Sequence, residues 1–178
     1  MKTIVIYTSQ TGFTKRYAEW IAERMNADMT ELTEAKKKDR GFFDQYDAVV
    51  YVGWCMAGKI VKAGWFLENA PGWRSKRLAV VAVGASPAGT PEAEEPLKQM
   101  LTEDQKQYIR AFYCQGGINY DRMKLPARMA MKMFAKSLKN RKNATDREKE
   151  MGEYISHSYD LSDIKYTEPV ISYLEGSD

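Results

Sequence analysis

Hydroxyl side chains gather at one turn near the start of the chain. The apolar run Thr3–Tyr7 is followed by the polar stretch TSQTGFT, residues 8–14, and then by a helical pattern. Backbone N–H groups at the start of a helix have no intrahelical acceptor and carry the positive end of the helix dipole, and hydroxyl groups add further donors. The turn therefore suits a phosphate group, although Ser and Thr are also ordinary helix N-caps and the stretch alone fits a capped helix equally well.

Other motifs for nucleotides and metals are missing. The turn has neither the Gly-Lys-Ser/Thr ending of a P-loop nor the G-x-G-x-x-G pattern of a dinucleotide-binding turn. Cys55, Cys114 and the single histidine, His157, show no metal-ligand spacing. We therefore expect no metal ion. Two cysteines are too few for a disulfide framework, which favours a reducing cytoplasm.

The elements that must position the turn alternate along the chain. Short apolar runs predict strands at Thr3–Tyr7, Ala48–Val52, Leu78–Val83 and Ile109–Cys114, with a weaker strand at Met29–Leu32. Helical spacing predicts helices near residues 17–25, 60–67, 92–101, 145–155 and 164–174, of which the fourth begins with the capping-box pair Thr145 and Glu148. Strands separated by helices imply a parallel sheet that is covered on both faces.

Length and charge bound this interpretation. The chain has 178 residues, of which 44% are hydrophobic, so residues 1–178 have the size of one compact domain. No run approaches the roughly 18 to 20 apolar residues of a membrane-spanning helix, and the chain begins directly with a strand pattern. We expect a cytoplasmic protein. The net charge of +3 says little about its partners.

Two further loops lie where a parallel sheet binds ligands, after the carboxyl ends of its strands. Ala48–Val52 leads into GWCMAGK, residues 53–59, where a tryptophan lies beside glycines that let a flat ligand approach the backbone. Leu78–Val83 leads into GASPAGT, residues 84–90, which consists of small residues. With the hydroxyl-rich turn, these loops describe a flat, phosphorylated aromatic ligand.

On these three loops the chain resembles the flavodoxin superfamily, and the resemblance covers nearly all of the sequence. SQTGFT, residues 9–14, is similar to that family's loop around the phosphate of flavin mononucleotide (FMN). The resemblance implies a flavodoxin-like three-layer α/β sandwich, with a five-stranded parallel sheet in the order 2-1-3-4-5 and the isoalloxazine ring between the other two loops. It implies FMN contacts from Ser9, Gln10, Thr11, Gly12, Phe13, Thr14, Trp54, Cys55, Met56, Ala57, Gly58, Lys59, Gly84, Ala85, Ser86, Pro87, Ala88 and Gly89. No side chain is assigned a catalytic role.

The sequence departs from small electron-carrying flavodoxins, which are strongly acidic and usually place a second aromatic residue after the fourth strand. Residues 84–90 contain no aromatic residue, so one face of the ring is open to a substrate or covered by Tyr113, Tyr120 or a later insert. NYDRMKLPARMAMKMFAKSLKNRK, residues 119–142, is similar to the insert of menaquinone-dependent protoporphyrinogen dehydrogenases.

These departures favour an FMN-dependent oxidoreductase. It would pass electrons or hydride between the flavin and a small hydrophobic acceptor or donor of the quinone or porphyrinogen type. Two alternatives are a flavodoxin-type electron carrier with a redox protein as partner, and a flavodoxin-fold binding module that has lost FMN.

The insert, at about residues 118–143, is basic and amphipathic. Residues 121–142 contain eight basic residues and one acidic residue. A helix over 122–142 groups the following residues on one face, with most of its basic residues on the other: Leu125, Met129, Ala130, Met133, Phe134, Ser137 and Leu138. This pattern fits a core face with a solvated basic back. It also fits a surface beside the flavin crevice that makes weak peripheral contact with anionic membranes, and we predict such contact. No nucleic-acid reader motif accompanies the charge, so we expect no nucleic-acid partner.

Several single residues have two interpretations. Trp54 fits either a ring-stacking residue or a core aromatic. Cys55 is interpreted as a residue that lines the pocket rather than as a redox thiol. Arg16 and Lys59 fit either charge partners of the flavin or solvated surface residues, and His157 fits a surface position. Because the implied strand order separates Cys55 from Cys114, we expect no disulfide between them.

Overall fold

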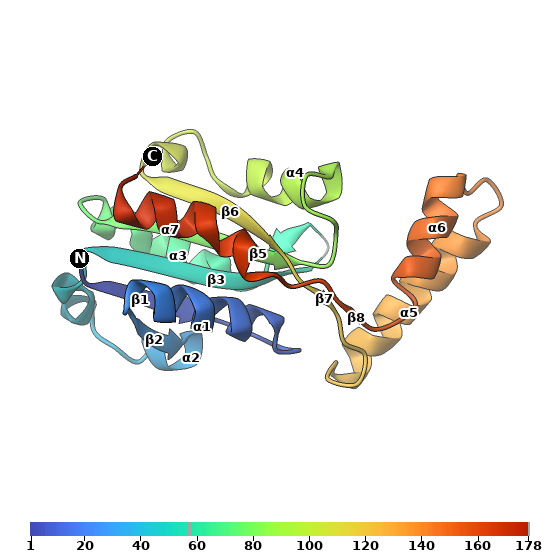
Figure 1. Ribbon diagram of the computed structural model, residues 1–178, viewed down its shortest axis with the longest axis horizontal. Helices are drawn as coiled ribbons and strands as arrows, with labels where there is room; N and C mark the ends of the chain where they lie inside the picture. The colour runs from blue at the N-terminus through green and yellow to red at the C-terminus, as the bar shows by residue number, and fades with distance from the viewer. Residues whose placement is uncertain (57, 178) are drawn as a thin grey trace.

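The computed structural model describes residues 1–56 and 58–177, and its centre is a parallel sheet (Figure 1). Five strands lie in the order β2-β1-β3-β5-β6, with the bounds β1 Thr3–Tyr7, β2 Asp28–Glu31, β3 Ala48–Met56, β5 Arg77–Gly84 and β6 Ile109–Gln115. All four pairings along this path are parallel. Counted within the sheet, this is the order 2-1-3-4-5, so the predicted flavodoxin-like α/β architecture is confirmed.

Side chains along the central strands alternate between two cores. Val49 and Tyr51 of β3 belong to one core, whereas Val50 and Val52 belong to the other. All four side chains are fully buried. A strand that is buried on both faces needs apolar residues at every position, which explains the continuous apolar runs in the sequence.

Helices cover both faces of the sheet and complete the three layers. On one face lie α1 (Phe13–Met25) and α7 (Glu168–Glu175), which is preceded by the 3₁₀ turn η4 (Ile164–Thr167). The core of the other face takes side chains from α2 (Leu32–Ala35), η1 (Arg40–Gln45), α3 (Ala63–Asn69), η2 (Ala70–Trp73) and α4 (Pro91–Met100). The turn η3 (Gln105–Gln107) leads into β6. Figure 1 shows α1 and α7 in front of the sheet and α3 behind it.

The segment after Val52 differs from the prediction. Instead of a loop followed by a helix at 60–67, β3 continues to Met56 and pairs antiparallel with β4 (Lys59–Ile60), and α3 begins only at Ala63. Ile60 is 7% exposed and packs in the core, and the N–H of Val61 donates to the carbonyl oxygen of Trp54 at 2.9 Å. Burial of Ile60 therefore stabilises an extended backbone where local spacing predicted a helix.

The insert is a helical hairpin that stands away from the sheet (Figure 1). It contains α5 (Leu125–Asn140) and α6 (Asp146–Tyr154), and the short antiparallel strands β7 (Gly117–Ile118) and β8 (Tyr159–Asp160) flank it. The predicted insert at 118–143 therefore contains only the first of the two helices. The predicted capping box of α6 is confirmed, since the N–H of Glu148 donates to the Thr145 hydroxyl at 3.2 Å and the Thr145 N–H donates to the Glu148 carboxylate at 2.8 Å.

The hairpin has a small core of its own, formed by Ile118, Tyr120, Ala135 and Ile155. No helix within residues 1–56 and 58–177 is both long enough and apolar enough to cross a bilayer.

Candidate functional site

An apolar pocket of about 360 Å³ lies at the carboxyl ends of β1, β3 and β5. Its walls come from the turn after β1, the end of β3, the end of β5 and helix α5. Three of these are the loops that the sequence singled out, and their meeting at one edge follows from the parallel arrangement of the strands.

The turn after β1 leaves several donors without a protein partner. Gly12 has φ of 105°, a left-handed conformation that suits glycine, and its N–H donates to the Ser9 hydroxyl at 3.2 Å. In the described part of the chain, the N–H groups of Thr11, Phe13 and Thr14 donate to no protein acceptor. These N–H groups lie at the start of α1, so the turn presents free donors at the positive end of a helix dipole.

Thr14 adds a hydroxyl group to this set. The residue is only 2% exposed and lines the apolar pocket, and no described residue forms a hydrogen bond with its hydroxyl group. Its oxygen keeps some accessible surface, because the unpaired side-chain oxygen that is fully buried among the described residues is that of Thr3. The Thr14 hydroxyl can therefore donate to an acceptor that a ligand supplies. The donor set therefore fits the phosphate group that the sequence predicted.

The second wall is the end of β3. Trp54, Cys55 and Met56 all line the pocket, and Met56 is 54% exposed at its rim. Burial raises the pKa of the Cys55 thiol from 9.0 to about 11, so this thiol is protonated at neutral pH. Cys55 and Cys114 are both free thiols, as expected.

The third wall, at the end of β5, is held in place by two tyrosines. The Tyr113 hydroxyl donates to the carbonyl oxygen of Ser86 at 2.6 Å, and a Cβ atom at Gly84 would lie 2.5 Å from the Tyr113 hydroxyl oxygen. Tyr159 donates to the carbonyl oxygen of Ala85 at 3.0 Å. Both tyrosines therefore fix the backbone of the loop after β5. Tyr120 packs in the core of the insert.

Helix α5 and the loop before it form a further wall of the pocket. Met123 in the preceding loop and Ala127, Ala130, Met131 and Phe134 in α5 line it. Of the three candidates to cover an open ring face, Tyr113, Tyr120 and the insert, the insert is therefore the one whose side chains form a wall of this pocket.

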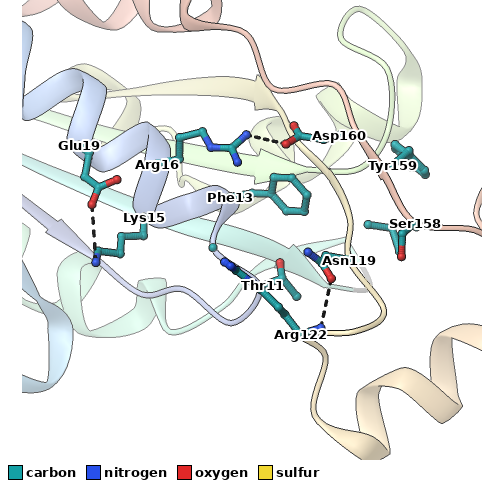
Figure 2. Close-up of a pocket in the computed structure, with 12 residues that line it drawn as sticks. Thr11, Phe13, Lys15, Arg16, Glu19, Asn119, Arg122, Ser158, Tyr159 and Asp160 are labelled. Carbon is teal, nitrogen blue, oxygen red and sulfur yellow. Dashed lines mark hydrogen bonds and ion pairs between the residues drawn. The ribbon is translucent and has the colours of Figure 1, made fainter.

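A second, polar pocket of about 550 Å³ borders the same turn (Figure 2). The two pockets share Thr11, Phe13 and Ile118. Two of the cations in the polar pocket are paired: Arg16 with Asp160 at 2.6 Å and Lys15 with Glu19 at 3.6 Å. Burial opposes ionisation of Asp160, but hydrogen bonds from Ser162 and Arg16 outweigh it and lower the pKa of this carboxyl group. Arg16 thus ties α1 to β8.

The predicted site residues fall into four groups. Those that border the apolar pocket are Gln10, Thr11, Phe13, Thr14, Trp54, Cys55, Met56, Gly84 and Ala85, and Gly12 borders the polar pocket. Among the described residues, Ser9, Gly58, Lys59, Ser86, Pro87, Ala88 and Gly89 border neither. Ala57 lies outside the described residues.

The sequence reasoning missed Gly117 and Ile118, which line the apolar pocket. A Cβ atom at Gly117 would lie 2.1 Å from the carbonyl oxygen of Tyr159, so this position requires glycine for the close pairing of β7 with β8. The pair of consecutive glycines at 116–117 was the signal for this close approach.

Similar solved structures include a WrbA-like flavodoxin from Agrobacterium tumefaciens, with 19% identity, a TM-score of 0.49, and coverage of 71% of this chain and 87% of that chain. A flavodoxin from Streptococcus pneumoniae TIGR4 has 13% identity, a TM-score of 0.49 and 100% coverage of both chains. A flavoprotein from Lactobacillus acidophilus NCFM, solved in complex with FMN, has 15% identity, a TM-score of 0.45, and coverage of 64% and 91%.

No curated protein matches the sequence. The flavodoxin domain family matches residues 4–146, which include β1, β3 and β5, whose loops form the pocket. The chain belongs to the flavodoxin domain family.

Proposed function

We propose that the chain is an FMN-dependent oxidoreductase for a small hydrophobic substrate of the quinone or porphyrinogen type. The observation that carries the proposal is the composition of one pocket. Backbone donors of Thr11, Phe13 and Thr14 that have no partner among the described residues border it, and so do apolar side chains of α5.

The donors at the turn would hold the phosphate of FMN. A phosphate dianion accepts several hydrogen bonds, and each charge-assisted bond contributes about 1.5 to 3 kcal/mol. Trp54 would lie against one face of the isoalloxazine ring, since it lines the same pocket. When bound, the flavin supplies the exchange of electrons or hydride, and the protein supplies binding, orientation and exclusion of water.

The wall from α5 favours a substrate over a protein partner at the ring. Met123, Met131 and Phe134 present flexible or aromatic apolar side chains to the pocket, which suit a flat hydrophobic molecule. A pure electron carrier needs only an exposed ring edge, and α5 would cover part of that edge.

We also propose that the exposed side of α5 makes weak contact with an anionic membrane. Leu125 is 71% exposed, Met129 58% and Met133 69%, so these side chains form an apolar stripe on the outside of the hairpin. Arg128, Lys132 and Lys136 lie beside this stripe, and a negative bilayer surface complements both features. A hydrophobic substrate dissolved in the bilayer would then reach the pocket along α5.

Flavin titration of the purified protein tests the cofactor. Its absorption spectrum and mass spectrometry should identify bound FMN, and the deflavinated protein should bind FMN more tightly than riboflavin. Thr14→Val should remove much of this preference, whereas Thr30→Val on β2 should keep it. No affinity for FMN, or equal affinity for FMN and riboflavin, would overturn the assignment.

Electron transfer to a short-chain naphthoquinone tests the substrate class. The chemically reduced, FMN-loaded protein should supply the two electrons that convert the quinone to the quinol, with protons taken up from the buffer. Ala130→Phe narrows the pocket and should slow this reaction at least tenfold, while reduction of ferricyanide, which needs no apolar pocket, should continue at the original rate. An equal effect of Ala130→Phe on both acceptors would favour an electron carrier.

A further inference from the structure

An arginine of the insert reaches the turn that is proposed to bind phosphate. A Cβ atom built at Gly12 would lie 3.0 Å from Nη1 of Arg122, so the guanidinium group is in contact range of the Gly12 backbone. Figure 2 shows the Arg122 side chain running from the loop before α5 toward the start of α1. The approach is possible because Gly12 carries no side chain.

Arg122 differs from the other cations of the polar pocket because no carboxylate in the described part of the chain pairs with its guanidinium group. Lys15 and Arg16 are paired with Glu19 and Asp160. Among residues 1–56 and 58–177, no Asp or Glu forms an ion pair with Arg122. A guanidinium group beside free N–H donors at the start of a helix creates a positive site that favours an anion. Its planar geometry allows two parallel hydrogen bonds to the oxygens of a phosphate group.

Hydrogen bonds fix the loop that carries Arg122, and none of them uses the guanidinium group of Arg122. The Arg122 N–H donates to the Asn119 side-chain oxygen at 3.1 Å, as Figure 2 shows. The Tyr120 N–H donates to the Ser158 hydroxyl at 3.0 Å, and the Tyr120 hydroxyl donates to the carbonyl oxygen of Ile155 at 2.6 Å. The arginine is therefore presented from a defined turn at the base of the insert.

We infer that Arg122 binds the phosphate group of the flavin from the insert, together with the donors of the turn, and thereby couples cofactor binding to the packing of α5 at the pocket. This inference rests on the proposed function. The phosphate would bridge the core and the insert, because Thr11 and Thr14 belong to one and Arg122 to the other. By thermodynamic linkage, FMN then stabilises the observed packing of α5, and this packing tightens FMN binding.

Two flavins that differ only in the phosphate test the inference. FMN and riboflavin are titrated into deflavinated wild-type protein and into Arg122→Gln, Arg122→Lys and the matched control Lys15→Gln, at low and high salt. Arg122→Gln should weaken FMN binding roughly 10- to 100-fold and leave riboflavin binding unchanged, since one charge-assisted interaction is lost. Arg122→Lys should fall between, because it keeps the charge but loses the planar fork. Lys15→Gln should resemble the wild type.

Hydrogen exchange provides a readout of the coupling to α5. In the wild type, FMN should protect residues 119–131 more than riboflavin does, and Arg122→Gln should remove the difference. An unchanged ratio of FMN to riboflavin affinity in Arg122→Gln, or an equal loss for both flavins, would overturn the inference. Absence of any flavin binding by the wild type would instead overturn the proposed function. Thermal unfolding of each variant establishes that a loss of binding is not a loss of folding.

Discussion

Gly152 in α6 packs directly against the backbone of Ala135 in α5. A Cβ atom at Gly152 would lie 2.8 Å from the carbonyl oxygen of Ala135, and 2.7 Å from Cγ of Lys139. The two helices of the insert therefore approach more closely than any other residue at 152 permits. Because α5 forms one wall of the apolar pocket, this contact also fixes the shape of the proposed substrate site.

Gly152→Val should separate the two helices. The carbonyl oxygen belongs to the backbone of α5 and cannot rotate away, so we expect a loss of about 1 to 3 kcal/mol in local stability, which is typical of overpacking. Hydrogen exchange should show faster exchange in α5 and α6 with little change in the sheet. Gly72→Val is the matched control, because no atom beyond its two chain neighbours lies within 4 Å of the added Cβ atom. Equal exchange rates in the two variants would show that the hairpin tolerates the added side chain.

Trp54→Ala should weaken the binding of FMN and riboflavin to the same extent. Stacking acts on the ring that both flavins share, and it contributes about 0.5 to 1.5 kcal/mol beyond the burial of area. Fluorescence titration checks this, with Trp20→Phe on α1 as a control that keeps the pocket intact. Bound FMN should quench the emission of the control, and less so that of Trp54→Ala. If Trp54→Ala keeps both the affinity and the flavin spectrum, Trp54 has only a structural role.

Cys55 should be unreactive at neutral pH. With a pKa raised by burial from 9.0 to about 11, its thiolate fraction at pH 8 is about a hundredfold below that of an ordinary thiol. The unfolded chain ionises this thiol first as pH rises, so its contribution to stability is present below about pH 9 and is lost between pH 9 and 11.

Alkylation with iodoacetamide and peptide mass spectrometry measure the reactivity of Cys55. Denaturant unfolding of the wild type and Cys55→Ala, compared from pH 7 to 10.5, isolates the contribution of this thiol to the pH dependence. Rapid modification of Cys55 at pH 7 in the folded protein would contradict this prediction and favour a redox role for the thiol.

The sheet was predictable from the sequence because burial on both faces leaves a local trace. Runs such as Leu78–Val83 are apolar at every position, and few other structures produce that pattern. The hairpin after β3 leaves no such trace, since it depends on the pairing of Cys55 with Ile60 and on a turn at Gly58, whose φ is 74°. The approach of Arg122 to Gly12 joins residues that are distant in the chain, so no local pattern indicates it.

Periodicity indicated that α5 is amphipathic but not which of its sides is buried. The helix packs on α6 and the pocket through Ala127, Met131, Ala135 and Leu138. Of the predicted apolar face, Ala130 and Phe134 line the pocket and Leu138 packs in the core of the insert, whereas residues such as Leu125 and Met133 face solvent. Which side of α5 is buried depends on its packing against α6, where Gly152 allows close contact with Ala135 and Glu153 pairs with Lys139.

The outward stripe of α5 should bind anionic vesicles weakly and in a salt-dependent manner. Each Lys or Arg near such a surface contributes about 1 kcal/mol, and this contribution falls as salt screens the charges. Charge reversal of Arg128, Lys132 and Lys136 to Glu should therefore reduce binding at least tenfold at low salt. Lys139 is left unchanged, because it pairs with Glu153 and holds the two helices together.

Flotation with anionic and neutral vesicles, at low and high salt, measures this association. Met129→Gln with Met133→Gln tests the apolar part of the stripe, since both side chains are exposed and lie outside the lining of the pocket. Lys36→Glu with Lys37→Glu, in the loop after α2, controls for a general change in charge. Binding that falls equally in this control and in the α5 variants would reflect net charge alone. Absence of binding to anionic vesicles at low salt would leave α5 as a wall of the pocket without a role at the membrane.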